Sequence, residues 1–163
     1  MAQANDVLGN DDFYKRIAKK ADFTYTDESP KDIAGWVKES TLTVTVRLYP
    51  GKPGSTTTAY VSSKYPNTIF LNSRKLGRDT PKIVNTIVHE CVHSVDRSLP
   101  DARFGHGNNR RRGKQNSAPY WIGSLAERIL KGVSSAKDHT IVNDPIRFVK
   151  EFEEIDESLI DDK

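Results

Sequence analysis

The spacing of apolar residues along the chain changes from a helical period to a two-residue period and then returns to the helical one. Apolar residues four positions apart predict a short amphipathic helix over residues 11–21, and Ser29 followed by Pro30 is a typical start of the next helix. Between Thr41 and Tyr49 every second residue is apolar and many residues are β-branched, which predicts a half-buried strand.

Two further strands are predicted after a turn rich in proline and glycine over residues 50–55. They span Thr57–Ser62 and Thr68–Asn72. Because the links between these strands are short, we expect a small, mostly antiparallel sheet.

The most apolar helix is predicted to begin at Thr80-Pro81, and its broad apolar face indicates that it lies in the core. The following connection over residues 98–119 has no periodic pattern and is longer than a usual connection, which is typical of functional loops. Helical spacing resumes over residues 120–131 and again after Asn143-Asp144-Pro145. The sequence therefore predicts one α+β domain over residues 1–163, with helices packed on a small sheet.

Composition narrows the class of protein. Hydrophobic residues make up 36% and charged residues 29% of the chain, and no apolar run approaches the roughly 20 residues that span a bilayer. We therefore expect no membrane span. The N-terminal segment lacks the apolar stretch of a secretory signal peptide, so we expect a cytoplasmic location or export without a cleaved Sec signal. The single cysteine, Cys91, cannot form an intrachain disulfide.

The charge of the chain does not indicate a particular binding partner. The net charge of +3 is too small to require a nucleic-acid partner. A basic cluster and an acidic tail over residues 151–162 are both interpreted as solvated surface. The basic cluster consists of Arg110, Arg111, Arg112 and Lys114.

The apolar helix contains a motif with potential metal ligands and a potential base, His89-Glu90-Cys91-Val92-His93. Residues four apart on a helix lie within about 40° of each other, so both imidazoles project from one face and can hold one zinc ion. Glu90 lies roughly 100° from His89 and reaches the space beside the metal, where its carboxylate can accept a proton from water. An unpaired charge in so apolar a helix would be costly, which favours a functional role.

Through this motif and the order of elements around it, the chain resembles the zincin superfamily of zinc metallopeptidases. The resemblance implies hydrolysis of peptide bonds in an extended polypeptide, with His89 and His93 as zinc ligands and Glu90 as general base. It also implies an edge strand that aligns the substrate and a third ligand supplied after the helix.

The same residues would serve a zinc amidase acting on peptidoglycan or another amide. They would also serve a leaderless bacterial toxin or effector. A nucleic-acid-associated module that uses the basic cluster, with a structural zinc, is a further alternative.

The third zinc ligand is assigned to His106, because glycines on both sides permit the long loop to bend sharply and return its ring to the metal. Glu127, on the later helix, is an alternative, as are Asp101 and Asp96.

Five other residues receive roles from their positions. Asp96 lies about 20° from His89 on the helix and is predicted to accept the free N–H of a ligand imidazole. Tyr120 is a candidate to donate a hydrogen bond to the oxyanion of the tetrahedral intermediate, although packing of it and Trp121 as core rings is the favoured interpretation. Cys91 points away from the metal face. His139 lacks a partner pattern and is expected at the surface.

Overall fold

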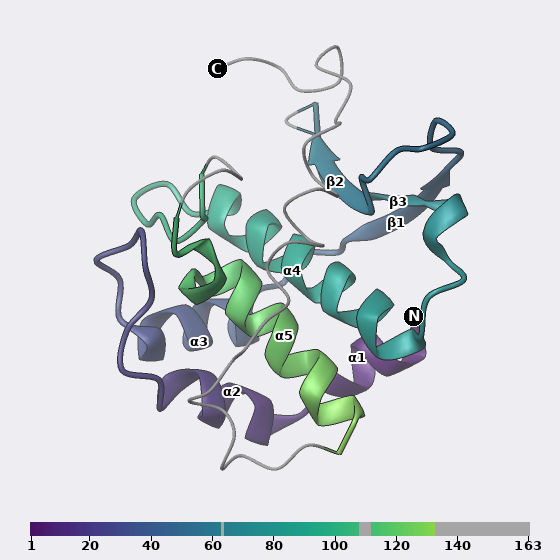
Figure 1. The fold of residues 1–163 in the computed structure, drawn as a ribbon. Coiled ribbons are helices and arrows are strands. Elements are labelled where there is room, and N and C mark those ends of the chain that lie inside the picture. The colour runs from purple at the N-terminus through teal and green to yellow at the C-terminus, as the bar shows by residue number, and fades with distance from the viewer. Residues whose placement is uncertain (63, 108–111, 133–163) are drawn as a thin grey trace.

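The computed structural model describes residues 1–62, 64–107 and 112–132, which fold into five α-helices and a three-stranded sheet (Figure 1). The predicted α+β class is confirmed. In chain order the elements are α1 (Ala2–Leu8), α2 (Asp11–Ala18), α3 (Pro30–Glu39), β1 (Thr45–Tyr49), β2 (Ala59–Ser62), β3 (Tyr65–Asn72), α4 (Thr80–Ser98) and α5 (Ala118–Leu130), with 3₁₀ turns η1 (Ser73–Lys75) and η2 (Lys114–Asn116).

The helix starts follow the capping chemistry of the sequence. The Asn10 side chain accepts a hydrogen bond from the Asp12 N–H at the start of α2, and the Ser29 side chain accepts one from the Asp32 N–H at the start of α3. Helix α2 ends at Ala18, three residues before its predicted end. Helix α1 was not predicted, because it contributes only two buried apolar residues and so has almost no periodic signal.

The sheet is mixed, with strand order β1-β3-β2. Strands β2 and β3 pair antiparallel, as predicted, whereas β1 pairs parallel to β3. The prediction assumed that strands close in sequence are neighbours, but β3 inserts between β1 and β2. Burial explains this order, because β3 carries the buried Ile69 and Leu71, whereas Leu48 on β1 is 60% exposed and suits an edge.

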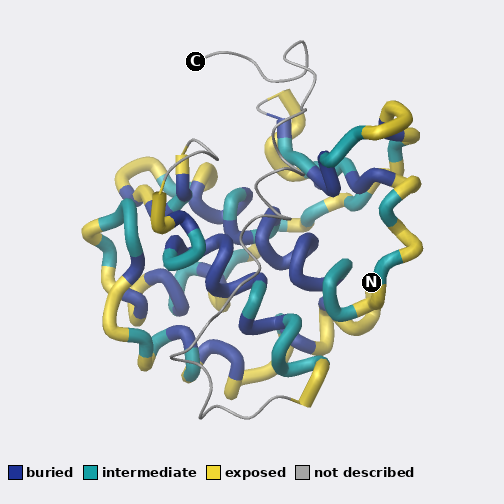
Figure 2. Tube along the Cα trace, viewed as in Figure 1, coloured by how far each residue is buried: buried dark blue, intermediate teal, exposed yellow. Residues whose placement is uncertain are grey.

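Helix α4 lies in the middle of the molecule, with the sheet on one side and α5 on the other (Figure 1). Its residues from Val84 to Glu90 are all buried, and Figure 2 shows the buried residues concentrated along α4 and α5. The predicted central position of this helix is confirmed. Among the described residues, none of the helices has the length and apolar character needed to cross a membrane.

Several predictions concern residues outside the described ranges. These are the helix after Asn143, the surface position of His139, the acidic tail, and Arg110 and Arg111 of the basic cluster.

Candidate metal centre

The two histidines of α4 lie one turn apart on the side of the helix that faces α5 and the loop after α4. His89 is buried and His93 is half-buried, and their ring centres are 5.0 Å apart. His89 forms a hydrogen bond with the backbone of Pro119, at the start of α5. The predicted convergence of the two imidazoles on one face is therefore present in the structure.

The loop after α4 brings His106 back to these histidines. The Asp96 carboxylate Oδ1 accepts a hydrogen bond from the Phe104 backbone N–H at 2.6 Å and so fixes the chain two residues before His106. At Gly105 a Cβ atom would lie 2.9 Å from Asp96 Oδ2 and 3.5 Å from His93 Nδ1, so only glycine fits there without a shift. The bend that the flanking glycines predicted is thus formed by a close approach to α4.

The role of Asp96 differs from the prediction. No hydrogen bond joins its carboxylate to an imidazole in the described part of the chain; it holds the loop backbone instead. The reason is that the loop carrying Phe104 packs onto the same face of α4 and offers a backbone N–H to the carboxylate.

The three histidines together form a cluster that could hold a metal ion. His89, His93 and His106 each offer one ring nitrogen, and these nitrogens all lie within 4.8 Å of one another. His93 Nε2 and His106 Nε2 lie 2.8 Å apart, and His106 Nδ1 lies 3.0 Å from the Gly107 carbonyl oxygen. That second contact leaves Nε2 of His106 directed at the cluster.

Burial keeps the cluster in the form that binds metals. It lowers the pKa of His89 and His93 well below the usual value of 6.5 and that of His106 to about 4, so all three rings are neutral at pH 7. Neutral imidazole is the metal-binding form.

Glu90, the predicted base, is buried next to the cluster's first histidine. Its side chain is 3% exposed, and its Oε1 atom has no hydrogen-bond partner within the described residues. Burial raises the pKa of Glu90 to about 7, an effect that the charge of Arg97 partly offsets. A carboxylate of this kind is suited to exchange a proton near neutral pH.

Tyr120, near the start of α5, packs its ring against the cluster. The centre of its ring lies 4.6 Å from that of His89 and 4.9 Å from that of His106. Burial raises the pKa of its hydroxyl well above the ordinary value of a tyrosine, so the phenol stays protonated and remains a hydrogen-bond donor. Trp121 points elsewhere and is a core ring packed on Phe23.

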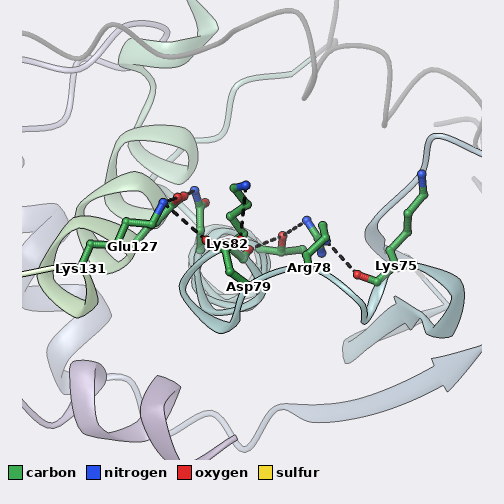
Figure 3. A network of polar contacts seen from close by, with 8 residues as sticks. Lys75, Arg78, Asp79, Lys82, Glu127 and Lys131 are labelled. Carbon is green, nitrogen blue, oxygen red and sulfur yellow. Dashed lines mark hydrogen bonds and ion pairs between the residues drawn. The ribbon is translucent and has the colours of Figure 1, made fainter.

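Two of the alternative ligands, Asp101 and Glu127, are not part of the cluster. Asp101 is exposed. Cys91, which was predicted to point away from the metal, packs against the core. Glu127 belongs to a different network, in which its Oε2 accepts a hydrogen bond from Asn85 at 2.8 Å and its Oε1 pairs with Lys131 (Figure 3).

The burial of Lys114, beside Tyr120, is a feature that the sequence did not indicate. Its position in a basic run predicted a solvated side chain, but it is 1% exposed, and its Nζ lies 5.3 Å from the centre of the Tyr120 ring. Neither its spacing nor its neighbours distinguish it from exposed Arg112, two residues earlier.

No family model, curated protein or solved structure matches the chain.

Proposed function

We propose that the protein is a zinc-dependent peptidase that hydrolyses peptide bonds. The observation that carries this proposal is the meeting of His106 with His89 and His93, on the helix that also carries Glu90. A helix with two incidental histidines would need no third imidazole brought back to it by a long loop.

The cluster's donor set fits zinc of the catalytic type. Zinc is held well by imidazole nitrogen, and catalytic sites commonly use three protein ligands and keep one position open for water or substrate. In the described part of the chain the cluster consists of three histidines. The buried Oε1 of Glu90 has no hydrogen-bond partner among the described residues and could accept a hydrogen bond from a water molecule at the site.

Each remaining step falls to side chains on α4 and α5. When bound, zinc would acidify a water molecule and polarise the scissile carbonyl. Glu90 accepts the proton of the attacking water and then delivers it to the leaving amine. Tyr120 donates a hydrogen bond from its phenol to the oxyanion that develops on the carbonyl oxygen.

An extended polypeptide is the substrate that we propose, aligned along β2. This strand lies at an edge of the sheet, runs antiparallel to β3 and contacts α4. An edge strand beside the active-site helix can bind an extended chain through backbone hydrogen bonds.

The test is the variant Glu90→Gln, which keeps the shape of the side chain but cannot accept a proton. We expect it to retain about one zinc ion per chain, by elemental analysis, and to lose at least about 100-fold in the rate of cleavage of unfolded polypeptides such as casein. Glu127→Gln is the matched control, because it makes the same change on α5 in the Asn85 network. Equal activity in Glu90→Gln and wild type would show that Glu90 is not the base.

A further inference from the structure

The two faces of the sheet differ in character. One face carries Ile69 and Leu71, which belong to the apolar core, and the sheet contacts α4. Because side chains alternate along a strand, Phe70 points to the opposite face, which we call the outer face. Arg47 on β1 and Tyr60 on β2 are the partners of Phe70 in the register, so these three residues form one row across the outer face.

Aromatic rings lie side by side on the outer face. The rings of Tyr60 and Phe70 are stacked, with their centres 5.0 Å apart and their planes at 14°. Tyr49 packs on Tyr60 at 5.3 Å between ring centres, and Tyr65 packs on Phe70 at 5.9 Å. None of the four rings belongs to the apolar core of the described residues, and Tyr65 is 48% exposed. Since large aromatic side chains contribute most in cores and at interfaces, rings outside the core indicate an interface.

The segment that forms the sheet is basic. Residues 41–78 contain six basic and no acidic residues, whereas the whole chain contains 25 basic and 22 acidic residues. Two of the basic side chains adjoin the rings, because Arg47 lies in the row with Phe70, and Lys64 Nζ lies 5.8 Å from the centre of the Tyr65 ring. Both Arg47 and Lys64 are exposed. The outer face therefore combines aromatic rings with positive charge, and a polyanion complements that charge.

We infer that the outer face of the sheet binds single-stranded nucleic acid, with bases stacked on the rings and phosphates paired with the basic side chains. Unpaired bases expose flat faces that stack on aromatic side chains, and the phosphates attract lysine and arginine. A double helix presents the same phosphates but covers the faces of its bases, so it would not engage the rings. The outer face uses none of the residues of the histidine cluster, and the inference does not rest on the proposed function.

The first experiment compares probes on the wild-type protein by fluorescence anisotropy. A labelled oligothymidylate of roughly 12 nucleotides should bind with a Kd of about 10 µM or lower at about 50 mM salt. An abasic analogue of the same length and charge should bind at least about fivefold more weakly, because it cannot stack on the rings. A duplex of the same length should also bind more weakly. Equal affinity for the oligothymidylate and its abasic analogue overturns the inference, because charge alone would then explain the binding.

The variant Tyr65→Ala tests stacking. It should weaken binding of the oligothymidylate at least about fivefold and leave the affinity for the abasic analogue unchanged, because it removes an exposed ring and no charge. Leu48→Ala is the matched control, since it removes a side chain that is 60% exposed on the same sheet but has no ring. It should bind both probes as wild type does.

The variant Lys64→Gln tests charge. It should weaken binding of both probes and reduce the slope of log affinity against log salt by about 0.7, the value for one phosphate contact with a single strand. Lys15→Gln is its control, because Lys15 is an exposed lysine on α2, away from the sheet (Figure 1). Wild-type affinity for the oligothymidylate in both Tyr65→Ala and Lys64→Gln overturns the inference.

Two further measurements cover the remaining outcomes. If Tyr65→Ala does not fold, the ring proton resonances of Tyr65 in the wild-type protein decide the question: a shift that the oligothymidylate causes and the abasic analogue does not supports the inference, and unchanged resonances overturn it. Binding to phosphatidylserine vesicles without binding to the oligothymidylate also overturns it and assigns the outer face to an anionic bilayer. Because the oligonucleotides contain no peptide bond, these results are independent of the outcome for Glu90→Gln.

Discussion

The two ends of the α4–α5 interface are both polar, but they are built from different groups. At the N-terminal end of α4, Asn85 donates to Glu127, and Lys131 pairs with both Glu127 and Asp79 (Figure 3). One to two turns further along α4 lies the histidine cluster, where three imidazoles face one another. No carboxylate belongs to that cluster in the part of the chain that the structure describes.

The polar groups of the Glu127 network bind one another, whereas the histidine cluster could bind an added metal ion. In the Glu127 network every acid meets a base or an amide, and the lysine and aspartate remain partly exposed. In the cluster, burial holds the imidazoles neutral with their nitrogens within 4.8 Å of one another. Neutral imidazole nitrogens gathered this closely can bind a cation placed between them. Four predictions test this comparison, from the largest expected effect to the smallest.

The largest effect is expected from His106→Ala. The variant removes a ligand, so its zinc affinity should fall more than about 100-fold, because loss of an outer hydrogen-bond partner alone typically costs 10–100-fold. Glu127→Ala should leave zinc affinity unchanged. Competition with a chelating dye measures both. If the two results are exchanged, Glu127 is the third ligand.

Gly123→Ala tests the close contact of α4 and α5 between the two ends. A Cβ atom at Gly123 would lie 2.8 Å from the Asn85 carbonyl oxygen and 3.2 Å from His89 Cβ. We expect the helices to move apart, at a cost of about 1–3 kcal/mol in the free energy of unfolding and with weaker zinc binding. Gly35→Ala in α3 is the control, because nothing lies within 4 Å of its Cβ position. It should stabilise the protein by roughly 0.5–1 kcal/mol. Urea unfolding measures both variants, and equal stabilities would contradict the tight contact.

The metal-free protein should lose stability in mild acid because of the cluster. Burial lowers the pKa of His106 from 6.5 to about 4, so between these pH values the unfolded chain binds a proton at His106 that the folded chain does not. The contribution of His106 to the free energy of unfolding is therefore fully present above about pH 6.5. It falls as the pH falls and is lost once the pH reaches about 4. From pH 8 to pH 5 we expect a loss of roughly 2 kcal/mol more in wild type than in His106→Gln. Urea unfolding of both metal-free proteins at these pH values measures the difference, and parallel curves would place His106 in solvent.

The smallest effect is expected at the other end of the interface. Lys131→Met removes the pairs of Lys131 with Glu127 and Asp79, but the Lys131 and Asp79 side chains are 39% and 45% exposed. Pairs of this kind contribute little, so the free energy of unfolding should fall by less than about 1 kcal/mol, and less still in high salt. Zinc affinity should not change. A large loss of bound zinc would show that the two ends are coupled.

The sequence by itself determined the parts of the site that depend on helix geometry. His89, Glu90 and His93 could be placed relative to one another because a helix advances a fixed angle per residue. Ser29 and Pro30 located the start of α3 for a similar reason, since a cap acts on the backbone within a few residues.

Only the tertiary structure decided which distant residues join that helix. His106 could be favoured from its flanking glycines, but its contact with His93 depends on the Asp96 hydrogen bond that fixes the loop. Likewise, Lys114 is buried through the packing of its segment on residues 24–25 and Tyr120, which no pattern in the basic run encodes. The order of the strands was decided in the same way, because burial of β3 against α4 outweighed the short connections that favoured a simple meander. These outcomes depend on contacts between residues far apart in the sequence, whereas periodicity and capping report only on near neighbours.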